Sequence, residues 1–74
     1  MNDSGLRVLV VEVSALLAER LNETIGQIAG LEVVGTTDTE QGALDILRTT
    51  NVDVMILELQ LREGTGFGIL KQLH

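Results

Sequence analysis

The chain has 74 residues, of which 45% are hydrophobic and 22% charged, and it contains no cysteine and no proline. This composition is typical of one small packed domain, and it excludes a disulfide scaffold, a thiolate metal site and a cysteine nucleophile. Eleven acidic residues against five basic ones give a net charge of −6, which disfavours direct binding to nucleic acid or to an anionic membrane.

The first half of the chain predicts a strand, a helix and a second strand. Residues 6–11 form a near-continuous apolar run, "LRVLVV", typical of a strand buried on both faces. A helix is expected from the N-cap Ser14 to about Ala29, where Gly30 would end it. Its apolar residues recur at helical spacing, at Leu17, Leu21, Ile25 and Ile28. Residues 31–36, "LEVVGT", predict the second strand.

The second half repeats the alternation. Asp38 or Thr39 can cap a second helix that ends at Asn51. The buried face expected for this helix consists of Ala43, Leu44 and Leu47. Residues 52–59, "VDVMILEL", predict the third strand, and the glycine-bearing loop "REGTG" follows it. The final stretch predicts the opening turns of a third helix, with apolar residues at spacings of three at Phe67, Leu70 and Leu73.

Three strands that alternate with helices predict a parallel sheet with right-handed crossovers, and therefore an α/β fold. Ligand chemistry in such sheets collects at the carboxyl ends of the strands. Glu12 ends the first strand and Glu58 ends the third. Two carboxylates at one sheet edge are suited to a hard cation such as Mg²⁺.

The order and spacing of these segments resemble the receiver domain of two-component response regulators. The resemblance covers residues 6–73 and rests on three stretches, "RVLVVEVSALLAERL", "LEVVGTTDTEQGALDIL" and "NVDVMILELQLREGTGFGILKQL". It implies a flavodoxin-like fold with strand order 2-1-3, and a histidine kinase as partner. It also implies that residues 1–74 form a single partial receiver domain, truncated after the third strand and the start of the third helix.

The residues expected to carry the family's chemistry depart from its pattern. The family holds Mg²⁺ with an acidic pair after the first strand and phosphorylates an aspartate at the end of the third. Here Glu12 and Val13 occupy the pair, and Glu58 occupies the phosphoacceptor position. The remaining metal-facing oxygens would belong to Glu12, Glu58 and the carbonyl of Gln60, a poor set for an ion that needs near-ideal geometry. We therefore expect no catalytic residue and no cofactor beyond weakly bound Mg²⁺.

Two further features of the third-strand loop affect this expectation. The extra methylene of Glu58 moves its carboxylate by roughly 1.5 Å from the position of an aspartate, which is enough to impair in-line phosphoryl transfer. Arg62 stands where the family usually has proline, and this replacement predicts a looser turn.

Three functions are compatible with the sequence. The leading hypothesis is a non-enzymatic, phosphorylation-deficient pseudo-receiver that acts through protein association in phosphorelay signalling. The alternative is a working phosphoacceptor in a longer regulator with a downstream output domain, for which DNA binding is one option. A third, a small nucleotide or metal enzyme, rests on "GTGFG", but the third glycine of G-x-G-x-x-G would fall on Ile69.

The expected partner and location follow from the same pattern. If the third strand is a sheet edge, its apolar residues 54–57 present unpaired backbone groups suited to pairing with another chain. We therefore predict a two-fold homodimer, by antiparallel pairing of the two third strands or by packing of exposed faces. No apolar run approaches the roughly 20 residues of a membrane span, and no signal peptide is evident, so a cytoplasmic location is expected.

Overall fold

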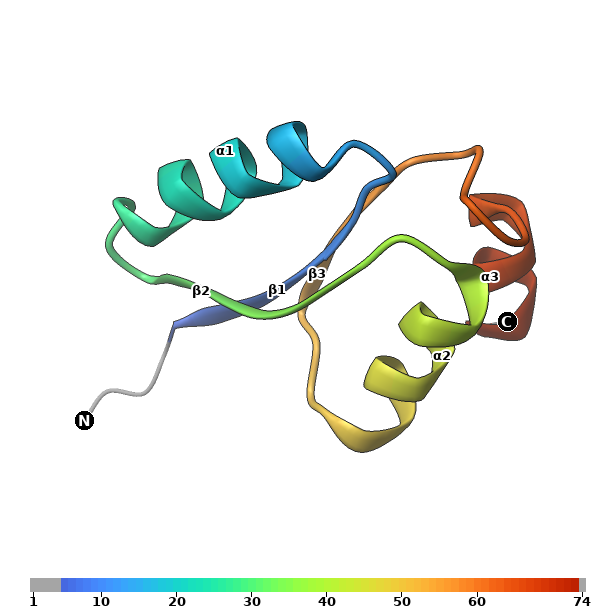
Figure 1. Ribbon diagram of the computed structural model, residues 1–74. Coiled ribbons are helices and arrows are strands. Elements are labelled where there is room, and N and C mark those ends of the chain that lie inside the picture. The colour runs from blue at the N-terminus through green and yellow to red at the C-terminus, as the bar shows by residue number, and fades with distance from the viewer. Residues whose placement is uncertain (1–4, 74) are drawn as a thin grey trace.

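The computed structural model describes residues 5–73 and shows a three-stranded parallel sheet with helices on both faces (Figure 1). The elements are β1 (Leu6–Val11), α1 (Ala15–Gly26), β2 (Leu31–Thr37), α2 (Glu40–Thr49), β3 (Val54–Leu57) and α3 (Gly66–Leu73). The strand order is β2-β1-β3, which confirms the predicted α/β architecture. Within residues 5–73, none of the helices reaches the length and hydrophobicity that a bilayer crossing requires.

A hydroxyl side chain caps the first turn of each helix. The Ser14 Oγ accepts a hydrogen bond from the Leu17 N–H at 3.1 Å, ahead of α1. Ahead of α2, the Thr39 Oγ1 accepts a hydrogen bond from the Gly42 N–H at 3.0 Å. Ahead of α3, the Thr65 Oγ1 accepts one from the Gly68 N–H at 3.0 Å. These caps satisfy N–H groups that a helix start leaves without intrahelical partners, and they fix where each helix leaves its loop.

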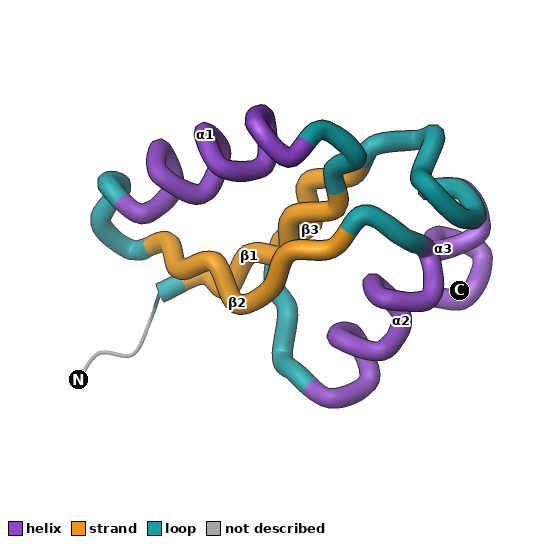
Figure 2. Tube along the Cα trace, in the orientation of Figure 1, coloured by secondary structure: helices purple, strands orange, loops and turns teal. Residues whose placement is uncertain are grey.

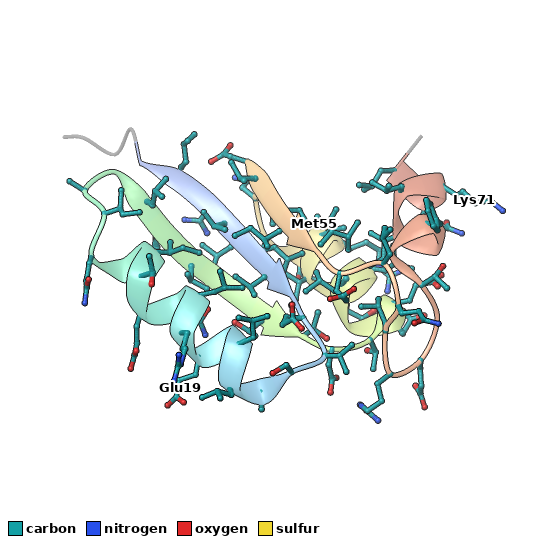
Figure 3. The ribbon with its side chains drawn as sticks, turned by 90° about the horizontal axis from the view of Figure 1, so that it is seen from above. Glu19, Met55 and Lys71 are labelled. Carbon is teal, nitrogen blue, oxygen red and sulfur yellow. The ribbon has the colours of Figure 1, made fainter. Side chains whose placement is uncertain are left out.

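The two faces of the sheet carry separate apolar cores. Leu9 and Val11 of β1 pack with Ala43 and Ile69 on the face covered by α2 and α3. Val8 and Val10 pack with Ile25 on the opposite face, covered by α1. Figure 3 shows Met55 on β3, and this side chain packs against the core beneath α2 and α3. Because β1 lies in the middle of the sheet and is buried on both faces, it is the strand on which both cores are built.

The register between β1 and β2 contains one irregularity. Val8 pairs with Val33, but the next residue, Leu9, pairs with Gly35, so that Val34 is the extra residue of a bulge. A side chain at Gly35 would meet Ile46 of α2, since its Cβ would lie 3.0 Å from the Ile46 Cδ1. The bulge therefore turns a glycine toward α2 and lets the helix approach the sheet closely.

The helix α1 differs from its prediction at its end and in its buried face. It ends at Gly26 rather than near Ala29, and the following turn leaves Ile28 about half exposed. Leu17 is also exposed, whereas Ala18 and Ile25 are buried. Leu21 and Ile25 thus pack against the core as predicted, whereas Ala18 takes part in the buried stripe in place of Leu17 and Ile28, because a small residue lets the helix come close to the sheet.

The third strand and third helix also differ in detail. The strand β3 spans four residues and not the eight predicted, since only its centre pairs regularly with β1. In α3 the fully buried side chain is that of Ile69, while Phe67, Leu70 and Leu73 are exposed. Gly66 sets this orientation, because a Cβ there would lie 2.7 Å from the Glu58 carbonyl oxygen and α3 approaches the end of β3 at that point.

Candidate functional site

The loops that follow the three strands leave the sheet from the same end (Figure 2). Val11 pairs with Leu57, and the Glu58 N–H donates a hydrogen bond to the Val11 carbonyl at 2.9 Å. Glu12 and Glu58 therefore follow directly after paired residues on adjacent strands. The structure brings the two acids of the predicted site to neighbouring positions at the carboxyl edge of the sheet.

The first loop, residues 12–14, is held by one bond within the loop and one bond to β2. The Glu12 carboxylate accepts a hydrogen bond from the Ser14 N–H at 3.0 Å, and the Glu12 N–H donates to the Thr37 carbonyl at 3.0 Å. Val13 lies between these residues with 43% of its surface exposed. A partly solvated apolar side chain thus stands directly after Glu12 in this loop.

The acid after β3 is also bonded to a nearby backbone group. The exposed Glu58 carboxylate accepts a hydrogen bond from the N–H of the next residue, Leu59, at 3.2 Å. Gln60 forms an isolated antiparallel bridge with Thr65, which involves its backbone in closing the loop. Among the described residues, no hydrogen bond joins the side chain of Glu12 to Glu58 or to Gln60.

These groups do not fit the needs of Mg²⁺. The ion requires near-octahedral oxygen coordination, usually with one or two carboxylates directed at it. Here the carboxylates of Glu12 and Glu58 are turned to backbone N–H groups, and Val13 contributes no oxygen. Across the part of the chain that the structure describes, no three His, Cys, Asp or Glu side chains are grouped in a way that could hold a metal ion.

A third acid at the same edge was not singled out as a site residue by the sequence. Asp38 follows β2 and forms a bidentate ion pair with Arg62, with Nε to Oδ2 at 2.9 Å and Nη2 to Oδ1 at 3.2 Å. The hydrogen bond from Arg62 lowers the pKa of Asp38, and the same bond raises the pKa of Arg62. The replacement of proline by Arg62 predicts a looser turn, but the structure shows that this arginine ties the turn to the loop after β2.

An open groove of about 940 Å³ lies along α1, beside the ends of β1 and β2. Its lining consists of Glu12, Val13, Ala15, Leu16, Ala18, Glu19, Asn22, Glu23, Thr36, Thr37 and Asp38. Four of these residues are acidic and none is basic, so the groove combines apolar side chains with a negative charge. In Figure 3 the labelled side chain of Glu19 points outward from α1. Such a surface favours a partner that carries basic side chains beside apolar ones.

Comparisons with known proteins agree with this architecture. The family model of the response regulator receiver domain matches residues 8–74. The protein-glutamate methylesterase/protein-glutamine glutaminase 1 of Dechloromonas aromatica (strain RCB) is 36% identical over 67 residues, which cover 90% of this chain and 19% of the relative. A protein of the same name, numbered 5, from Myxococcus xanthus (strain DK1622) is 36% identical over 70 residues, or 95% of this chain and 20% of the relative. The chain thus spans about a fifth of the length of these curated relatives.

Proposed function

Because the chain belongs to the response regulator receiver domain family, we propose that it is a receiver module of two-component signalling that works without accepting a phosphoryl group. Its role is to associate with other proteins, and it is not an enzyme. The observation that carries this proposal is the pair of side chains at the carboxyl edge, Val13 and Glu58, at the two positions where the family carries acids for metal binding and phosphoryl transfer.

Several features support the loss of phosphoryl transfer. In receivers the acidic pair holds the Mg²⁺ that neutralises the charge of the incoming phosphoryl group, and Val13 cannot ligate a cation. The longer side chain of Glu58 is bonded to the Leu59 N–H at 3.2 Å. A nucleophile displaced by roughly 1.5 Å loses most of the benefit of alignment. Both the metal and the acceptor are therefore compromised.

The proposal is tested with a small-molecule phosphodonor, acetyl phosphate, in the presence of Mg²⁺ and with intact-mass detection. We expect no stable gain of one phosphoryl group. The Glu58→Asp variant alone should behave in the same way, whereas Val13→Asp combined with Glu58→Asp should regain Mg²⁺ affinity, measured by NMR titration. A Mg²⁺-dependent phosphoryl adduct on the unmodified chain that is lost in Glu58→Gln would overturn the proposal.

The alternative is a working phosphoacceptor within a longer regulator. It is favoured by one observation, the position of Glu58, a carboxylate able to form an acyl phosphate, directly beside the Glu12 position. The same mass measurement distinguishes the two functions, since only the alternative predicts the adduct. The named relatives are methylesterases and glutaminases, and we propose that this chain corresponds to a regulatory receiver module rather than to an esterase.

A histidine kinase is the proposed partner of the groove along α1. Its apolar lining residues Val13, Leu16 and Ala18 can receive apolar side chains, and its acidic lining residues can attract basic ones. Binding measured at low and high salt tests this assignment. Affinity for a kinase dimerisation domain should fall with salt, and it should fall further in Leu16→Lys, which places a like charge in the partner's path.

We place self-association at the outer edge of β3. Among the described residues, β3 pairs only with β1, and its backbone on the other side has no partner strand. Val54 and Ile56 face the side of α1, while Met55 and Leu57 face the core beneath α2 and α3. A strand apolar on both faces is suited to the interior of a sheet, so pairing with a second copy would give it that position.

Light scattering after size exclusion at micromolar concentration tests the dimer. We expect twice the mass of 8.0 kDa, and a reduced dimer fraction in Val54→Lys, because a lysine on an edge strand opposes pairing. Ile28→Lys is the matched control, since Ile28 is exposed to a similar extent in a turn away from β3. A monomer whose melting temperature is independent of concentration would refute the assignment.

A further inference from the structure

The loop after β3, residues 58–65, is closed at its base by its own contacts. The Gly66 N–H donates to the Leu59 carbonyl at 2.8 Å, and Gln60 bridges Thr65. Leu61 is half buried and packs against the core beneath α2 and α3. The remaining tip of the loop, residues 62–64, has no comparable anchor within the loop itself.

The tip is instead bonded to the segment that follows β2, which lies more than 20 residues away in the sequence. The Arg62 N–H donates to the Asp38 carbonyl at 3.0 Å, in addition to the bidentate ion pair between their side chains. The Glu40 N–H donates to the Glu63 carbonyl at 3.0 Å, and the Thr65 N–H donates to the Glu40 carboxylate at 3.0 Å. Two loops that are remote in sequence are therefore joined along their length.

The ion pair between Asp38 and Arg62 is the part of this junction in which two opposite charges meet. An arginine that meets a carboxylate through two parallel hydrogen bonds is fixed in orientation as well as in distance. Both side chains remain accessible, with 60% of Arg62 and 40% of Asp38 exposed. An exposed pair stabilises only weakly and is screened by salt. Breaking it should release the loop tip locally and leave the sheet intact.

The loop has little stiffness of its own with which to replace the pair. It contains no proline, and Gly64 at its tip adopts a φ of 81°, in the left-handed region that glycine enters without strain. A tip that contains glycine can adopt many backbone conformations. Its observed conformation therefore depends on its contacts with the segment after β2.

From these contacts we propose that Asp38 and Arg62 form an electrostatic latch that holds the loop after β3 against the segment after β2. Arg62 is thus a positioning residue for the loop that begins with Glu58, and it takes over by ion pairing a role that a rigid backbone residue could otherwise fill. The latch opens when salt screens the pair or when either charge is removed. This inference does not depend on the proposed function, since it concerns the motion of the loop alone.

Amide hydrogen exchange measured by NMR on the whole chain tests the latch. The reporters are the amides of Glu40 and Thr65, which donate hydrogen bonds across the junction to the Glu63 carbonyl and to the Glu40 carboxylate. Arg62→Met should speed their exchange about two- to fivefold, the range expected for loss of an exposed ion pair, and should reduce the salt dependence of that exchange. The buried amides of β1 report on the fold and should be unaffected.

The matched control is Arg48→Met, which removes an arginine of similar exposure from its ion pair with Asp45 within α2. It changes the net charge equally and should leave the exchange of Glu40 and Thr65 unaltered. The second arm is a cycle of Arg62→Met, Asp38→Asn and the double variant, in which the double should exchange no faster than either single. Unchanged exchange in Arg62→Met, an equal effect of Arg48→Met, or additive losses in the cycle would each overturn the proposal.

Discussion

The loops after β1 and β3 both begin with a glutamate at the same sheet edge, yet they are held in different ways. In the short first loop, the side chains of Glu12 and Ser14 bond to backbone groups within three residues in sequence, and a single backbone bond reaches Thr37. The longer loop after β3 depends on Asp38 and Glu40, which belong to another part of the chain. One loop is thus defined by local chemistry and the other by tertiary contacts. The second should therefore be more sensitive to changes elsewhere in the molecule.

The largest expected effect tests how closely the loop after β3 is packed. A Cβ at Gly66 would lie 2.7 Å from the Glu58 carbonyl oxygen and 3.0 Å from the Leu57 Cγ. Gly66→Ala should therefore destabilise the fold by about 1–3 kcal/mol, the usual cost of overpacking, measured by urea denaturation. Gly26→Ala at the end of α1 is the control, because nothing lies within 4 Å of its Cβ. Equal stability of the two variants would contradict the close approach.

A smaller effect separates the two loops through their caps. Ser14→Ala and Thr39→Ala each remove a hydroxyl that accepts an N–H bond at a helix start, and each should cost about 1 kcal/mol. Their local consequences should differ. Thr39 caps the turn that begins with Glu40, whose carboxylate accepts the Thr65 N–H bond, so only its replacement should speed amide exchange at Thr65. If Ser14→Ala disturbs Thr65 to the same extent, the two loops are not supported independently.

The pH dependence of the free energy of unfolding should be a smaller effect still, and it should arise from the contact between Asp38 and the loop after β3. Because Arg62 lowers the pKa of Asp38, the folded state holds this proton less tightly than the unfolded state does. The associated stability is complete above the unfolded value of about 3.9 and is lost as the pH falls through the lower folded value. Unfolding midpoints of the parent and Asp38→Asn should therefore converge in acid. Glu40 and Glu63 are present in both proteins, so their contribution cancels in the comparison.

The smallest expected effect concerns the acid of the loop itself. Glu58 is exposed and its carboxylate bonds only to the adjacent Leu59 N–H among the described contacts. Glu58→Gln keeps an oxygen acceptor of similar shape, so we expect the fold and the oligomeric state to remain unchanged. Circular dichroism and light scattering measure both. A clear shift in the association constant would show that the charge of Glu58 takes part in assembly.

The sequence predicted what depends on local pattern and left out what depends on distant contacts. The apolar run of β1 and the cap Ser14 follow from residues within a few positions of each other, and the structure has them as predicted. For the second helix the structure selects Thr39 from the two predicted candidates, Asp38 and Thr39. The buried face of α3 could not be inferred from apolar spacing. Gly66 and Ile69 are buried because the helix packs closely against the end of β3 at Gly66, which is a tertiary contact. The pairing of Arg62 with Asp38 had no local signal, since the two residues are brought together only by the sheet.

The central position of β1 has a consequence for the order in which the chain folds. Val8 pairs with Val33, 25 residues along the chain, and with Val54, 46 residues along. Closing the longer loop costs only about 0.5 kcal/mol more, but contacts distant in sequence form more slowly. The unit of β1, α1 and β2 should therefore assemble first and offer one side of β1 as a template. Until β3 docks there, that open side of β1 is the place where a nascent chain is most exposed to mispairing with another.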